Sequence, residues 1–270
     1  MSLTLTPLGT VAPYPKGNKN CPGYLIEYGD YKVLFDCGNG CTRLLNFPDD
    51  LNNLVIFISH LHPDHIGDLV SLLQTIMVYR SYGYVNSKIH LYLPETLEKQ
   101  YEYDEDEMGW MVSRTVEKNA VDYEYIKKYA NEADVEMHLI GNKVDFMDFS
   151  IDNKSVVHPI KSYAFRFDSP EGSITYSGDT GMCNSLQALA QDSDLFICES
   201  TFIKGQQWLQ NHHLYAYEAA EIAKEANVKQ LLLTHFWPEI DKNFYKEEAR
   251  KIFDNVDVAE EGKRICLRRQ

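Results

Sequence analysis

Three imidazoles and a carboxylate stand within six residues in the segment His60-Leu61-His62-Pro63-Asp64-His65. The segment follows the apolar run 54–59 and precedes a helical period that begins near Ile66. Histidine is a poor core residue, and neighbouring histidines repel one another once they are protonated. Neutral imidazoles and carboxylates are, by contrast, good ligands for zinc, manganese or iron. The segment therefore predicts a metal site at the end of a strand.

Three further residues of ligand type stand directly after apolar runs. They are His158, Asp179 in the sequence SGDT, and His235 in the sequence LLLTHF. Open α/β folds place their chemistry where the strands end. A loop as short as HLHPDH cannot fill a metal coordination sphere alone, so we expect these residues to complete the site.

The rest of the chain reads as strands interleaved with helices. Apolar, β-branched and aromatic runs with turn signals between them predict strands at 31–35, 54–59, 88–93, 163–167, 173–176, 195–198 and 230–234. Apolar residues at helical spacing predict helices at 66–79 and 216–227. This alternation is typical of a layered α/β protein with mixed sheets.

Length and composition limit the function classes. The 270 residues carry no repeat or linker, which predicts one domain over 1–270. Lysine plus arginine is 26 and aspartate plus glutamate is 40, a net charge of −14, which argues against a protein that coats nucleic acid. The apolar runs are too short for a membrane span, the first residues do not resemble a signal peptide, and the six cysteines are irregularly spaced. We expect a cytoplasmic protein with reduced thiols and no membrane partner.

One segment, 95–134, is acidic and rich in tyrosine. We expect it to be a helical insertion. A solvated excursion, a lid over the active site and a contact in a homodimer are the roles open to it.

The metal-binding pattern resembles the metallo-β-lactamase superfamily. The match lies in the order HxHxDH, His158, Asp179 and His235, and the run VLFDCGNG at 33–40 is similar to the first motif of that family. The resemblance implies a four-layer αββα sandwich with two mixed β-sheets and a two-metal site at one edge. Asp36 would orient a ligand.

The resemblance also implies how the ligands divide. His60, His62 and His158 would hold one divalent metal, Asp64, His65 and His235 would hold the second, and Asp179 would bridge both. Zn²⁺ is the favoured ion and Mn²⁺ the alternative. Two such cations can share a bridging hydroxide that acts as the nucleophile of a hydrolase at neutral pH.

Two further motifs narrow the reaction. Glu199 in ESTF, and His213 shortly before EAAEIAKEA, resemble the ribonuclease Z and small phosphodiesterase branch. In that branch a histidine faces the scissile phosphate and a glutamate orients it, so we expect His213, Glu199 and Asp64 to be the catalytic residues. His212 is the competing candidate for the phosphate-facing position. Trp208 and Trp237 are candidates for a base-stacking pocket.

The chain departs from ribonuclease Z in one respect. Those enzymes insert a basic arm between the third histidine motif and the bridging aspartate, whereas His158 and Asp179 here are 21 positions apart with Arg166 the sole arginine between them. Transfer RNA is therefore an unlikely partner. The chain is more similar to the compact YhfI-like bacterial metallo-hydrolases of the branch. We expect a phosphodiesterase that acts on a small phosphate diester, such as a cyclic or short nucleotide.

Three alternatives remain open. The first is a lactonase or thioester hydrolase on the same metal site. A ribonuclease Z-type tRNA 3′ endonuclease and a non-catalytic metal-binding protein rank below it.

Overall fold

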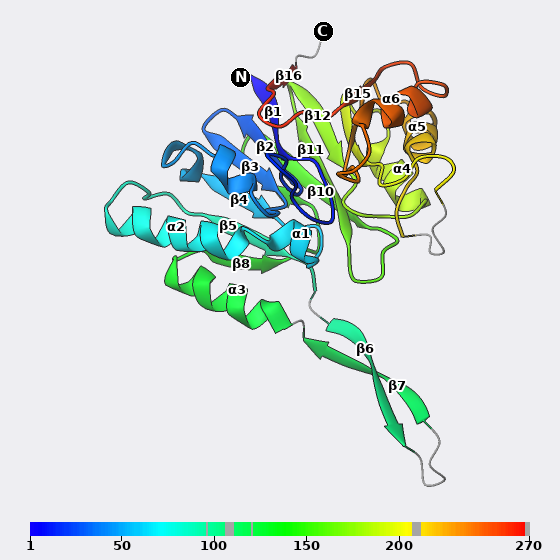
Figure 1. Cartoon of the computed structure of the whole chain (residues 1–270). Helices are drawn as coiled ribbons and strands as arrows, with labels where there is room; N and C mark the ends of the chain where they lie inside the picture. The colour runs from blue at the N-terminus through cyan, green and yellow to red at the C-terminus, as the bar shows by residue number, and fades with distance from the viewer. Residues whose placement is uncertain (96, 106–110, 120, 207–211, 268–270) are drawn as a thin grey trace.

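The computed structural model describes residues 1–95, 97–105, 111–119, 121–206 and 212–267, and of 97–105, 111–119, 121 and 122 it describes the backbone. Two seven-stranded sheets pack face to face, and helices cover the outer face of each (Figure 1). Within the described part of the chain, no helix has the length and hydropathy that a membrane span requires.

The first sheet holds the amino-terminal strands and closes with the last strand of the chain. In spatial order its strands are β16 (Ile265–Leu267), β1 (Leu3–Gly9), β2 (Gly23–Tyr28), β3 (Tyr31–Phe35), β4 (Leu54–Phe57), β5 (His90–Leu93) and β8 (Glu136–Leu139). β1, β2 and β3 are antiparallel, whereas β3, β4, β5 and β8 are parallel.

The second sheet repeats this arrangement. In spatial order its strands are β15 (Val256–Val258), β14 (Leu231–Thr234), β13 (Leu195–Glu199), β12 (Gly172–Tyr176), β11 (Tyr163–Ser169), β10 (Ser150–Ser155) and β9 (Val144–Asp145). β9 to β12 are antiparallel and β12 to β15 are parallel. Both sheets are therefore mixed, as predicted.

Three apolar clusters match the three interfaces between layers. One joins the first sheet to α2 (Leu69–Ser81) and α3 (Val121–Glu132), one fills the space between the sheets, and one joins the second sheet to α4 (Asn184–Ala190), α5 (Ala216–Glu225) and α6 (Lys242–Ala249). The order of layers is helix, sheet, sheet, helix, which confirms the predicted αββα sandwich.

The helix predicted at 66–79 is interrupted near its start. A short helix, α1 (Pro63–Ile66), contains the end of the HLHPDH motif, and α2 begins three residues later. The buried residues of α2 follow the predicted helical spacing: Leu69, Leu72, Leu73 and Ile76. The break lets the motif follow the end of β4 while α2 packs along the sheet.

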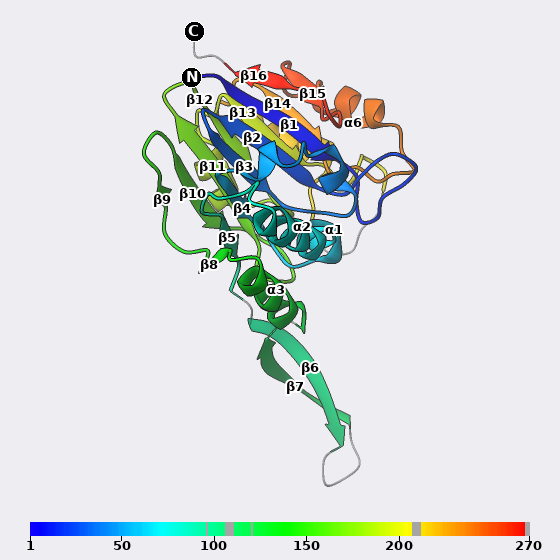
Figure 2. The same cartoon turned by 90° about the vertical axis from the view of Figure 1, so that its left-hand side faces the viewer.

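The segment 95–134 differs from the expected helical insertion. Its described residues form an antiparallel hairpin of β6 (Leu97–Glu105) and β7 (Met111–Asn119), followed by the helix α3. The hairpin forms a two-stranded sheet of its own and projects from the sandwich in both views (Figures 1 and 2). The prediction gave more weight to the charged residues of this segment than to its tyrosine and β-branched residues, which favour strands and stand at 101, 103, 112, 115 and 116.

Candidate dinuclear metal centre

The predicted site residues meet where the parallel strands of both sheets end. The HLHPDH motif follows β4, Asp179 follows β12, Glu199 is the last residue of β13, and His235 follows β14. His158 lies after β10, whose end pairs with the start of β11 beside the end of β12. Strands that run in the same direction thus bring residues more than 170 positions apart to one edge.

The backbone at this edge adopts costly conformations. Asp36 and His235 have φ angles of 59° and 61°. Such positive φ values cost a non-glycine residue of order 1 kcal/mol or more, and residues that carry this cost tend to cluster at functional sites. Gly178 has a φ of 58°, and a Cβ there would lie 2.6 Å from the carbonyl oxygen of Tyr163. This glycine therefore permits the turn that places Asp179.

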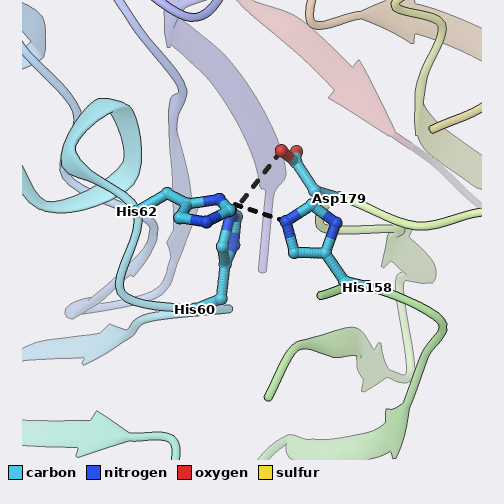
Figure 3. A group of neighbouring side chains, drawn as sticks. All are labelled: His60, His62, His158 and Asp179. Carbon is cyan, nitrogen blue, oxygen red and sulfur yellow. Dashed lines mark hydrogen bonds and ion pairs between the residues drawn. The ribbon is translucent and has the colours of Figure 1, made fainter. Parts of the chain in front are cut away.

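One group of candidate ligands comprises His60, His62, His158 and Asp179 (Figure 3). Nδ1 of His62 lies 3.0 Å from Nε2 of His60 and 3.1 Å from Nε2 of His158. An Asp179 oxygen lies 3.7 Å from Nε2 of His60. Three imidazole nitrogens and one carboxylate oxygen thus point toward a common centre.

The second group shares Asp179 with the first. Oδ1 of Asp179 lies 3.0 Å from Nε2 of His235 and 3.2 Å from Nε2 of His65. Oδ2 of Asp64 lies 3.6 Å from His235 and 3.7 Å from His65. All four candidate ligand atoms lie within 4.8 Å of one another. Because Asp179 belongs to both groups, the geometry suits a pair of cations with one bridging carboxylate.

Asp36 orients two of the imidazoles through contacts to their Nδ1 atoms. Its carboxylate accepts hydrogen bonds from the backbone nitrogen and hydroxyl of Ser59, from the Tyr176 hydroxyl, and from Nδ1 of His65 at 2.7 Å. Since the Ser59 hydroxyl donates to Asp36, its oxygen is left to accept from Nδ1 of His60 at 3.0 Å. Both histidines therefore keep the lone pair of Nε2 for a metal.

Two more imidazoles are oriented in the same way. The Thr201 hydroxyl donates to Glu199 at 2.7 Å, so it accepts from Nδ1 of His235 at 2.8 Å. Nδ1 of His158 donates to the carbonyl oxygen of His212 at 3.2 Å. Nε2 is again the nitrogen directed at the candidate metal position.

The charge state of the donors fits divalent cations. Burial holds the pKa of His60 well below its usual value and lowers the pKa of His158 to about 4, so both are neutral. At His65 and His235 the Asp179 carboxylate outweighs burial and raises the pKa, to about 10 for His235, so a cation bound there would replace a proton on each ring. Oδ1 of Asp179 is buried and accepts no hydrogen bond from the described residues, although two imidazole nitrogens lie close to it. Lone pairs directed at one another, with an unsatisfied buried carboxylate oxygen among them, are what a bound cation would satisfy.

His213 approaches the same centre from the segment before α5. Its Nδ1 lies 3.0 Å from Glu199 and 3.9 Å from Asp179. Glu199 is buried and also accepts from the backbone nitrogens of Thr180 and Leu214. This fixed carboxylate orients the His213 ring, whereas His212 contributes its backbone carbonyl to the site.

A cavity of about 370 Å³ opens beside the candidate ligands. Its wall away from the ligands is apolar and consists of Ala12, Pro13, Phe202 and Trp237. Tyr14 packs edge-on against Trp237 at a centroid distance of 6.1 Å. Trp208, the other tryptophan predicted for such a pocket, lies outside the described residues.

Three residues at the centre were not predicted from the sequence. Ser59 and Thr201 stand next to predicted site residues, so a search for hydroxyls beside strand-end ligands would have found them. Tyr176 gives no such signal, because it donates its hydrogen bond to Asp36, a residue 140 positions away in the chain.

Comparison with known proteins agrees with the fold and the donor set. A family model described as the beta-lactamase superfamily domain matches residues 31–236. The chain belongs to this superfamily. Its two mixed sheets and His/Asp clusters are those of a metallo-β-lactamase-fold, metal-dependent hydrolase.

Known proteins match over nearly the whole chain. The probable metallo-hydrolase YhfI of Bacillus subtilis is 26% identical over 96% of this chain and 98% of its own, and its crystal structure superposes with a TM-score of 0.79 over 97% of this chain and 99% of that chain. Ribonuclease Z of Archaeoglobus fulgidus is 27% identical over 97% of this chain and 96% of its own. A diphosphatase from the PhnP family, 18% identical, has the same fold, with a TM-score of 0.67 over 97% of both chains.

Proposed function

We propose that the protein is a dinuclear-metal phosphodiesterase that hydrolyses a small phosphate diester, with cyclic or short nucleotides as the substrate class. One observation carries the proposal. His213 is held 3.0 Å from buried Glu199 at the rim of a centre in which Asp179 belongs to both candidate ligand groups. Divalent cations, with Zn²⁺ favoured and Mn²⁺ the alternative, would supply Lewis-acid activation of the phosphate and of water.

His213 has the properties of a general acid. Burial lowers its pKa, but the neighbouring Glu199 carboxylate outweighs burial and raises the pKa above its usual value. The raised pKa favours the protonated ring, which is the form that a general acid requires. Since Nδ1 is engaged with Glu199, Nε2 is the nitrogen that can donate to a leaving alkoxide. A phosphate diester produces such an alkoxide, and its phosphoryl oxygens also favour a nearby cation.

The cavity suits a small substrate with an apolar or planar group. Its volume of about 370 Å³ lies near the lower end of the range for small-molecule sites. Trp237 is 37% exposed, so one part of the indole remains available for stacking. A net charge of −14 disfavours a long polyanion such as transfer RNA.

The names of two relatives support chemistry at phosphate. One is called a ribonuclease and the other a diphosphatase. The apolar wall of the cavity also favours a second candidate, a lactonase or thioester hydrolase, whose acyl chain would lie against Trp237.

The test is hydrolysis of bis-p-nitrophenyl phosphate after reconstitution with Zn²⁺ or Mn²⁺. A monoester, a lactone and a glutathione thioester are measured beside it, together with Asp179→Ala. Diester turnover that disappears in the variant supports the proposal. Lactone or thioester turnover without diester turnover would assign the second candidate function, and metal binding without any turnover would identify a non-catalytic metal-binding protein.

A further inference from the structure

A second cluster of metal-ligand type lies on the edge strand of the first sheet and the strand beside it. It comprises His90, the first residue of β5, and Glu136 and His138 of the neighbouring edge strand β8. Its position along the strands differs from that of the candidate dinuclear centre. His90 pairs with Val55 near the start of β4, whereas His60 follows the end of β4, roughly 15 Å farther along at the usual rise per strand residue.

The register of β5 and β8 brings the three side chains to one face. His90 is opposite Glu136, and Tyr92 is opposite His138. Alternate residues of a strand share a face, so all four side chains are on the same side of the sheet. The Tyr92 ring stacks on His138 with centroids 4.6 Å apart, which holds that imidazole in place.

The distances fit a single cation. Nδ1 of His90 lies 3.1 Å from Nε2 of His138 and 3.4 Å from Oε2 of Glu136, and the three atoms lie within 4.8 Å of one another. Ligands about 2.1 Å from a tetrahedral zinc ion lie about 3.4 Å apart. The cluster therefore needs little adjustment to surround one ion.

The local charges also permit binding. Lys88 pairs with the other Glu136 oxygen at 2.9 Å, but its side chain is 79% exposed and can leave without a burial cost. Glu136 itself is 47% exposed, so an ion can enter from solvent.

We propose that His90, Glu136 and His138 form an accessory site for one divalent transition-metal ion, separate from the dinuclear centre. Two imidazoles and a carboxylate are a zinc-type donor set, and water would complete the coordination. The ion would link edge strand β8 to β5.

The experiment counts Zn²⁺ per chain by equilibrium dialysis and atomic emission. The full chain is compared with the double variant His90→Ala/His138→Ala, and Lys88→Ala is the matched control because it changes the same strand surroundings but no ligand. We expect the double variant to bind one Zn²⁺ fewer than the wild type, and Lys88→Ala to bind the same number. Equal counts in the wild type and the double variant would overturn the proposal.

Two additions make the result independent of folding and of the dinuclear centre. Circular dichroism and thermal melting establish that the double variant is folded, and the single variant His138→Gln replaces it if it is not. The same comparison in an Asp179→Ala background should again differ by one Zn²⁺. A difference of one ion that persists there supports the accessory site even if the proposed phosphodiesterase activity fails.

Discussion

Asp36 organises the candidate metal centre although it is not a candidate ligand. Its carboxylate fixes the protonated nitrogen of His65 directly and that of His60 through Ser59. An asparagine at position 36 would place its NH2 group opposite groups that themselves donate hydrogen bonds. At least one imidazole would then have to turn. The position of this one side chain therefore determines how tightly the ligands are preorganised.

We therefore expect Asp36→Asn to weaken Zn²⁺ binding by about 10–100-fold, the usual effect of removing a partner that orients a metal-bound histidine. Competition with a chromophoric chelator measures the affinity. Asp68→Asn is the matched control, because Asp68 accepts hydrogen bonds from Thr42 and contacts no candidate ligand in the bonds described here. Equal affinity in the two variants would show that Asp36 does not orient the histidines.

The adjacent histidines provide a second test at this scale. His213→Gln removes the proposed general acid and should lower kcat for the diester by about 10²–10⁴-fold. His212→Gln keeps the backbone carbonyl that orients His158 and should change kcat by less than about threefold, as expected for a side chain outside proton transfer. Steady-state kinetics with both variants at saturating metal measures the effect. A larger loss of kcat in His212→Gln than in His213→Gln would instead assign the general-acid role to His212.

At the scale of elements, the sequence predicts some of the buried strands and misses others. β3 was predicted with its observed bounds, and β12, β13 and β14 were predicted to within a residue or two, whereas β1 and β2 were not predicted although nearly all their residues are buried. The HLHPDH motif was recognisable because four of the candidate ligands stand within six residues of the sequence. Among the contacts that orient the ligands, the one from Tyr176 to Asp36 was not recognisable, because it joins residues 140 positions apart.

The hairpin was missed because charge and strand propensity conflict in its sequence. Charged residues are interspersed through 97–105 and 111–119, so the apolar alternation by which a strand is recognised is weak there. The role of the hairpin is open to a direct test.

We expect removal of the β6–β7 hairpin to leave turnover of a small diester within about threefold of the wild type, because the site is assembled from strand ends of the sandwich. Residues 97 and 119 are paired, so a short Gly-Ser linker can replace the segment between them. The value of kcat/KM for the diester measures the effect. A loss of more than about tenfold in a folded variant would instead assign the hairpin a lid function.

The start of β13 offers a pH-dependent test of stability. Asp194 accepts hydrogen bonds from the backbone nitrogen and hydroxyl of Ser173 and pairs with Lys229 at 2.6 Å. Burial raises the pKa of Asp194, but these partners outweigh it and lower the pKa below its usual value. The stabilisation is thus complete above the unfolded-state pKa of about 3.9 and is lost as the pH falls through the lower folded-state value.

Asp194→Asn should reduce the free energy of unfolding by about 1–2 kcal/mol at pH 7. The difference from wild type should stay constant down to about pH 5 and shrink toward pH 3. Denaturant unfolding of both proteins at each pH measures it. Lys229→Ala should cost no more than about 1 kcal/mol, because the Lys229 side chain is 66% exposed. An equal cost would show that the ion pair, rather than the bonds to Ser173, provides the stabilisation.

At the scale of the whole molecule, the candidate metal centre lies at the junction of the two sheets. His60, His62, Asp64 and His65 follow the first sheet, whereas His158, Asp179 and His235 follow the second. Ions bound by both sets would join the sheets at one edge, in addition to the apolar cluster between them. Metal binding should therefore stabilise the entire sandwich and not the site alone.

Removal of the metal should lower Tm as well as abolish diester turnover. A ligand present at 1,000 times its Kd stabilises the folded state by about 4 kcal/mol, which is a large part of the stability of most domains. Calorimetry of the chelated, Zn²⁺-loaded and Mn²⁺-loaded protein measures the shift, and Asp179→Ala should show a much smaller one because it lacks the shared carboxylate. If chelation abolished turnover but left Tm unchanged, the ions would be bound too weakly to join the sheets. If Asp179→Ala kept the full shift, the stabilising ion would lie elsewhere, and the His90 cluster would be the first place to look.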